Sequence, residues 1–199
     1  KSTLEYVHIN KTSGVSDGAL NLTGGVTFYK SDVGISNSVL GGTSAEDALN
    51  IVRSNYNISG VKIINTRSDG FDSDFSIGTL SGSVFNDIGG DAVDFSGGEH
   101  KVLNVNISGV HDKGVSAGEG SKVRLSDMQI SRVGVGVVAK DGSHVVSEKV
   151  AITDFKIHAA MSYMKKNFYE MPSLIISELS HDGVDPFFRQ IGSMMTVDG

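Results

Sequence analysis

The feature that most constrains this chain is an internal repeat of 22 residues. Similar four-residue units begin at Ala48, Gly70, Ala92, Gly114, Gly136 and His158, each 22 residues after the one before. An earlier unit at 19–22 fits at a step of 29, which predicts a seven-residue insertion in the segment 30–42. A fixed period of this length indicates a solenoid in which each coil stacks on the preceding one.

Apolar residues lie two positions apart within each unit, as they do on one face of a β-strand. A helical repeat would instead show spacings of three and four. The apolar positions align into four columns. These are Leu20, Leu49, Phe71, Val93, Val115, Val137 and Ala159; Leu22, Ile51, Ser73, Phe95, Ala117, Ala139 and Met161; Ile63, Phe85, Ile107, Ile130 and Ile152; and Thr66, Ile88, Val110, Val133 and Phe155.

The fold class that follows is all-β, a single-stranded right-handed parallel β-helix with coils of about 22 residues and six or seven coils in all. A leucine-rich repeat has a similar period, but its Leu-x-x-Leu-x-Leu-x-x-Asn signature is absent. We expect residues 1–199 to form one β-helix domain in which 161–199 is an irregular C-terminal coil or cap. The segment 4–9 resembles the late strand of an incomplete coil. We therefore expect a fragment or C-terminal part of a longer chain, attached to further domains N-terminally.

Composition narrows the range of partners. Gly is frequent, with 25 residues against only 2 Pro, as suits many tight turns between short strands. The net charge of −6 argues against nucleic acid as a partner. No apolar run is long enough for membrane insertion. The absence of Cys excludes thiolate metal sites, the six His show no metal-binding spacing, and His100 and His144 are interpreted as turn residues.

An acidic ladder is the strongest candidate site. Asn50, Asp72 and Asp94 share one outward column, and Asp74 adds a further outward carboxylate. Asp69 and Asp91 come just before the same strands. Stacked strands are about 4.8 Å apart, and two charges at that distance repel by about 3.5 kcal/mol at an effective dielectric of 20. Such a cluster is expected to raise some pKa values, recruit a cation, or pair with a nearby base, for which Lys113 and Arg53 are the candidates.

Three interpretations of the ladder stay open at this stage. A Ca²⁺ site would draw on the carboxylates of Asp69, Asp72, Asp74, Asp91 and Asp94. A sugar-binding or catalytic face would use Asp69, Asp91 and Asn50 for binding, with Asp72, Asp94 and Lys113 as acid–base groups. Alternatively, the ladder is solvated surface whose aspartates cap turns. The expected cofactor is accordingly none, or Ca²⁺.

The segments 69–76, 90–96 and 113–119 resemble bacterial right-handed parallel β-helix repeat proteins of the pectin-lyase-like superfamily, most closely a secreted or surface branch. That superfamily includes lyases, polygalacturonase-type hydrolases, epimerases, tailspikes and adhesins, so the resemblance implies a fold more than an activity. The Asn-Thr-Asp, Gly-His-Gly and Arg-Ile-Lys motifs of the polygalacturonases are absent. So is the Asp-Pro-His-Asp signature of mannuronan epimerases, since Asp185-Pro186 is followed by Phe187.

The resemblance therefore implies an extracellular or cell-surface module, with the periplasm as another location. It would bind or scaffold polysaccharide without a recognisable catalytic motif. The alternative is a polysaccharide lyase or uronate epimerase acting over the Asp69–Asp94 face.

Overall fold

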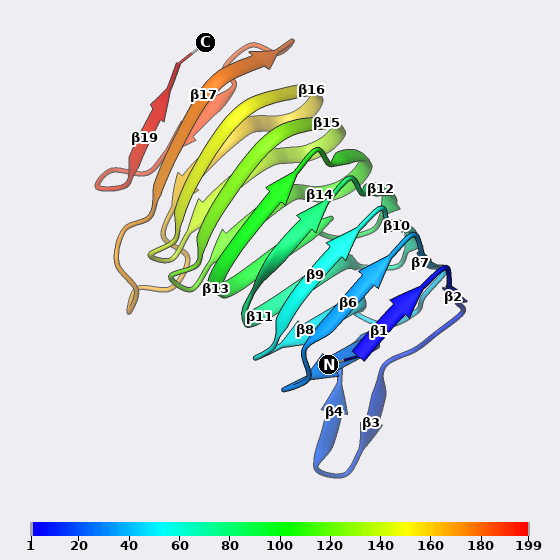
Figure 1. Cartoon of the computed structure of the whole chain (residues 1–199). Coiled ribbons are helices and arrows are strands. Elements are labelled where there is room, and N and C mark those ends of the chain that lie inside the picture. The colour runs from blue at the N-terminus through cyan, green and yellow to red at the C-terminus, as the bar shows by residue number, and fades with distance from the viewer. Residues whose placement is uncertain (1, 199) are drawn as a thin grey trace.

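The computed structural model describes residues 2–198 and is a parallel β-solenoid of about eight turns, with the two ends of the chain at opposite ends of the stack (Figure 1). Three faces run along its axis, which we call A, B and C in the order in which a complete coil such as 47–66 passes through them. No helix in the described part of the chain is long and apolar enough to cross a membrane. The predicted fold class, a right-handed parallel β-helix, is confirmed, with about eight turns where six or seven were expected.

Some strands occupy one face and others continue around a corner into the next. Face A holds β5 (Gly24–Tyr29), β8 (Asp47–Val52) and β18 (Phe187–Arg189). Face B holds β1 (Ser2–Glu5), β6 (Val33–Ser36), β9 (Asn55–Ser59) and β19 (Met194–Val197). Face C holds β2 (His8–Asn10), β7 (Val39–Gly41), β10 (Lys62–Thr66) and β12 (Val84–Ile88). The strands that bend around corners are β11 (Asp69–Ser81), β13 (Val93–Leu103), β14 (Asn106–Gly118), β15 (Lys122–Lys140), β16 (His144–Tyr163) and β17 (Ser173–His181).

The predicted columns form the core over most of their length. On face A, Leu49, Phe71, Val93, Val115 and Val137 follow one another in strand register and are fully buried. On face C, Ile63, Phe85, Ile107, Ile130 and Ile152 do the same. Each apolar side chain therefore contacts its equivalents in the coils above and below, and the hydrophobic effect holds the stack together.

The first coil departs from the prediction. The residues expected to stack, Leu20 and Leu22, belong to β4 (Leu20–Leu22), which pairs antiparallel with β3 (Val15–Asp17) in a hairpin that projects from the solenoid (Figure 1). Strand β5 takes their place, with Val26 opposite Leu49. The insertion thus lies between β2 and β5 and not in 30–42. A hairpin strand and a stacked strand share the same alternation, so the local pattern did not separate them.

A second departure is a change of register late in the stack. The pairing of β15 with β16 is irregular between Val133 and Val135, and afterwards Val137 lies opposite Ala160 and not Ala159. Met161 consequently lies opposite Val138, and Ser162 lies opposite Ala139. One extra residue at a bulge shifts every later side chain to the other face of the strand.

His100 and His144 lie on strands and not in turns, which corrects their interpretation as turn residues. His144 points outward from face B, whereas His100 is buried inside the solenoid. His100 Nε2 donates to the carbonyl of Gly97 at 2.8 Å, so its Nδ1 is free to accept from the Tyr56 hydroxyl at 2.9 Å. The imidazole also stacks on Phe95 at 4.1 Å between ring centroids. Burial lowers the pKa of His100 to about 4, so the ring is neutral near pH 7.

Gly78 makes this contact possible because it lies between Tyr56 and His100 in the same inward column. A Cβ at Gly78 would lie 2.4 Å from the Tyr56 ring. We expect Gly78→Ala to destabilise the protein by about 2 kcal/mol through overpacking, which is a loss of roughly 4–8 °C in melting temperature for a chain of this size. Thermal melts followed by circular dichroism measure this. Thr79→Ala, at the outward-facing neighbour, is the control, and equal melting of the two variants would contradict the packing described.

Candidate functional site

The acidic ladder lies on the outward side of face A, where strand pairing places Asn50, Asp72, Asp94 and Ser116 in one column of successive coils. Asn50 is buried, and its side-chain amide connects the carboxyl groups of the ladder by hydrogen bonds. Its Nδ2 donates to the carboxyl oxygens of Asp72 at 2.9 Å, Asp74 at 3.3 Å and Asp47 at 3.5 Å. One amide therefore draws three carboxyl groups together.

This crowding changes the proton affinity of the carboxyl groups. Burial, reinforced by the neighbouring carboxylates of Asp74 and Asp47, raises the pKa of Asp72 to about 9. Burial likewise raises the pKa of Asp47 to about 7, and it also raises the pKa of Asp74. Asp72 is thus a carboxylic acid that keeps its proton at neutral pH and can donate a hydrogen bond.

Asp69, Asp91 and Lys113 occupy the corner that leads from face C into face A. Asp69 Oδ1 accepts from the backbone N–H of Asp91 at 2.8 Å, and Asp91 Oδ1 accepts from the backbone N–H of Lys113 at 3.0 Å. Burial raises the pKa of both carboxyl groups, that of Asp91 to about 6. Asp69 and Asp91 therefore each tie one coil to the next through a backbone hydrogen bond, as expected of capping aspartates.

Lys113 is held as a cation at this corner. Its Nζ lies 3.2 Å from Asp91 Oδ1 and 2.5 Å from Asp112 Oδ2. Burial acts to lower the pKa of Lys113, but the attraction of Asp91 and Asp112 outweighs it, so that this pKa is raised. A lysine that keeps its proton so firmly does not suit the role of a base.

Lys140 is a residue of this site that sequence reasoning missed. Its Nζ lies 3.6 Å from Asp94 Oδ1, and both side chains are mostly buried. Arg53, the other expected base, lies over the ring of Phe75, with its guanidinium carbon 5.9 Å from the ring centroid, and forms no ion pair with the ladder within residues 2–198. Lys140 is distant from Asp94 in sequence, and only the stacking of two further coils brings it to this position.

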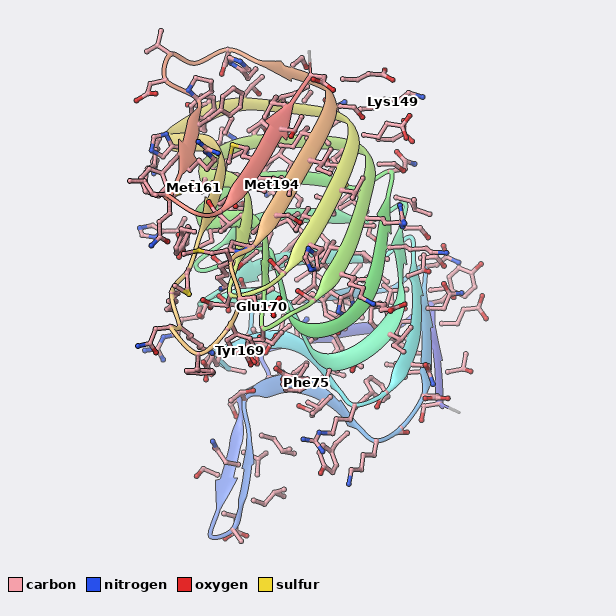
Figure 2. All side chains as sticks on the ribbon, turned by 90° about the vertical axis from the view of Figure 1, so that its left-hand side faces the viewer. Phe75, Lys149, Met161, Tyr169, Glu170 and Met194 are labelled. Carbon is pink, nitrogen blue, oxygen red and sulfur yellow. The ribbon has the colours of Figure 1, made fainter. Side chains whose placement is uncertain are left out.

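Two insertions flank the ladder on face A. The β3–β4 hairpin borders the early coils, where a cavity of about 460 Å³ is lined by Leu20, Leu22, Asn50 and Asp74 among others. The loop 164–172 borders the late coils, and Asp141 Oδ1 fixes it by accepting from the backbone N–H groups of Lys165 and Lys166 at 2.6 Å each. Figure 2 shows the hairpin and the loop with Tyr169 and Glu170 projecting on the same side of the solenoid, away from Lys149.

No metal centre is assembled from side chains in this part of the chain. Across residues 2–198, no three or more His, Asp or Glu side chains are grouped closely enough to hold a metal ion. Several carboxyl groups of the ladder already have partners: Asp72 and Asp74 accept from Asn50, Asp91 pairs with Lys113, and Asp94 pairs with Lys140. Ca²⁺ binding by the five aspartates therefore stays a prediction for experiment.

Comparison with known proteins agrees with the fold. The chain resembles solved structures of an alginate lyase from Paenibacillus sp. str. FPU-7 (TM-score 0.61, 10% identity, covering 88% of this chain and 76% of that one) and of the pectate lyase Pel9A (0.51, 12%, covering 96% and 68%). It also resembles the Agl-KA catalytic domain (TM-score 0.57, 12% identity). That match covers 98% of this chain and 41% of the other. No curated protein matches the sequence.

The family model described as "Right handed beta helix region" matches residues 47–176, well over half of the chain. Those residues include the ladder, from Asp47 to Asp94, together with Lys113 and Lys140. The chain belongs to the right-handed β-helix family.

Proposed function

We propose that this protein is an extracellular or cell-surface polysaccharide-associated module and that face A is its glycan-binding trough. The observation that carries the proposal is the position of the two insertions. The β3–β4 hairpin and the loop 164–172 come from opposite ends of the chain, yet both border the face that carries the ladder. A long polar face with raised borders suits an extended, hydroxyl-rich polymer better than a compact ligand.

The chemistry of the ladder supports the same proposal. Sugar hydroxyls both donate and accept hydrogen bonds, and the ladder offers groups of both kinds. Asp72, whose burial raises its pKa to about 9, acts as a donor. Asp94, whose side chain is 21% exposed, offers its carboxyl group as an acceptor. The named activities of the similar alginate and pectate lyases add support for a polysaccharide ligand.

Cleavage of a bound glycan is the second candidate, and the arrangement of Asp72 and Asp94 favours it. The two residues are adjacent in register, and their partners lie on opposite sides: Asn50 for Asp72 and Lys140 for Asp94. Hydrolysis of a glycosidic bond uses two neighbouring carboxyl groups, one of which acts as the acid, and the raised pKa of Asp72 suits it to that role. A lyase or epimerase needs a base beside the uronate, and the firmly protonated Lys113 does not serve as one. Hydrolysis is therefore the better supported reaction over face A.

The test is a panel of alginate, pectate and neutral glucans offered to the whole chain. Binding is measured by calorimetry, and products are measured both as new reducing ends and as absorbance of unsaturated sugars. We expect at least one glycan to bind, and Asp72→Asn combined with Asp94→Asn to weaken that binding at least tenfold, which corresponds to about 1.4 kcal/mol.

Asp127→Asn is the matched control, because Asp127 is an exposed aspartate at the corner between faces B and C. This control should bind like the wild type. New reducing ends without unsaturated product indicate hydrolysis, whereas unsaturated product indicates the lyase alternative. A wild type that binds no glycan, or a double variant that binds as well as Asp127→Asn, contradicts the assignment of face A.

A further inference from the structure

A second trough lies on face B, away from the acidic ladder. Its volume is about 630 Å³, and it crosses the face B segments of β11, β13, β15 and β16, which are stacked along the axis (Figure 1). The outward side chains that line it are Ile77, Thr79, Glu99, Lys101, Lys122, Arg124, His144 and Val146. The proposed function of face A uses none of them.

The charge of this trough is unusual in a chain whose net charge is −6. Lys101 and Arg124 lie directly opposite each other on adjacent strands, and both are exposed. Lys122 is compensated by Glu99 at 3.1 Å, but neither Lys101 nor Arg124 has an ion pair or side-chain hydrogen bond within residues 2–198. Like charges directly opposite each other on neighbouring strands repel. Two uncompensated cations held in register make a site that an anion would complete.

Apolar side chains accompany the two cations. Ile77 is 55% exposed and Val146 is 39% exposed, and both line the trough beside the charged pair. No Phe or Tyr is among the residues that line the trough. Single-stranded nucleic acids are held by basic grooves with aromatic rings on which bases stack. This trough has the basic side chains but no Phe or Tyr ring for stacking. Charged sugar rings fit better, since each presents a carboxylate and an apolar C–H face.

We propose that the face B trough binds an acidic polysaccharide, with carboxylates of uronate residues paired to Lys101 and Arg124. The inference rests on the proposed function only in taking a polysaccharide as the ligand. It places a separate, non-reacting anchor on a different face from the ladder. A chain bound there would stay attached to the protein while face A engages the same or another polymer.

Calorimetry of the whole chain with polygalacturonate tests the proposal, with alginate, a neutral glucan and single-stranded DNA as further probes. The double variant Lys101→Gln/Arg124→Gln should lose at least tenfold in affinity for polygalacturonate, and its remaining binding should depend less on salt. The control Lys149→Gln/Lys156→Gln removes two exposed lysines outside the trough and should change the affinity less than twofold. Thermal melts verify that each variant is folded.

The outcomes separate the two faces. Asp72→Asn/Asp94→Asn removes only the proposed face A site, so polygalacturonate binding that persists in this variant and is lost in Lys101→Gln/Arg124→Gln belongs to face B, whether or not the face A assignment holds. Equal losses of affinity in Lys101→Gln/Arg124→Gln and in the control Lys149→Gln/Lys156→Gln would mean that overall charge is responsible, and this result would overturn the proposal. The proposal is also overturned if the wild type binds no acidic polysaccharide, or if it binds DNA more tightly than polygalacturonate.

Discussion

Val115→Asp is expected to leave the protein largely unfolded. Val115 is fully buried on face A, between Val93 and Val137 in the stacked column. An unpartnered carboxylate at this position costs about 3–5 kcal/mol or more, which is a large share of the 5–15 kcal/mol that stabilises a typical domain. The measurement is far-ultraviolet circular dichroism with thermal melting, and we expect the strand signal and the cooperative transition to disappear.

Asn106→Asp provides the matched control for this prediction. It adds the same charge on the same strand, β14, at an exposed outward position. It should melt within a few degrees of the wild type, because surface substitutions away from special features usually change stability by less than about 0.5 kcal/mol. If Val115→Asp were soluble and melted like Asn106→Asp, the column would not be the core of the solenoid.

Asp72→Asn is expected to stabilise the protein, and by more as the pH rises. The pKa of Asp72 is about 9 in the folded protein against 3.8 in an unfolded chain. Between these values the native state binds more protons than the unfolded state, so the contribution of Asp72 to stability falls as pH rises from about 4 to 9. Asn resembles the protonated acid and does not titrate. Because Asp72 keeps part of its contact with solvent, we expect a gain on the order of 3 kcal/mol at pH 9, or roughly 6–12 °C in melting temperature.

Melts of the two proteins at matched pH values isolate this effect. His100 acts in the opposite direction, since its pKa is lowered to about 4 and its contribution to stability is lost as pH falls from about 6.5 to 4. That loss is common to wild type and variant and cancels in the difference. The difference should be near zero at pH 4 and largest at pH 9. A difference that does not vary with pH would mean that Asp72 titrates normally in the folded protein.

Thermal melts in the presence of Ca²⁺ and of a chelator test the Ca²⁺ hypothesis separately. If the five aspartates bind Ca²⁺ only in the folded state, a hundredfold excess over Kd adds about 2.7 kcal/mol to the stability of the wild type. Asp72→Asn/Asp94→Asn should lose that gain. Identical wild-type melts in Ca²⁺ and in chelator would remove Ca²⁺ from consideration and leave the pH prediction as it stands.

The sequence by itself determined the solenoid, because each coil repeats the same inward and outward alternation with the period of one turn. Where the step is constant, as from Leu49 to Val137, side-chain direction follows from counting alone. The same counting placed Asn50, Asp72 and Asp94 in one outward column. The assignment of Asp69 and Asp91 to the adjoining corner also follows from their positions just before those strands.

Only the tertiary structure decided what happens where the step changes or where a partner comes from a distant coil. The bulge in β15 and β16 and the β3–β4 hairpin carry the same local alternation as regular strands, so Ala159, Leu20 and Leu22 were placed wrongly. His100 is buried and His144 exposed because one residue is added between Gly118 and Lys122, so that His100 pairs with Val123, and Val123 pairs with Val145 and not with His144. The pairing of Lys140 with Asp94 depends on how far a flexible side chain reaches across stacked coils, and no spacing in the sequence encodes that distance.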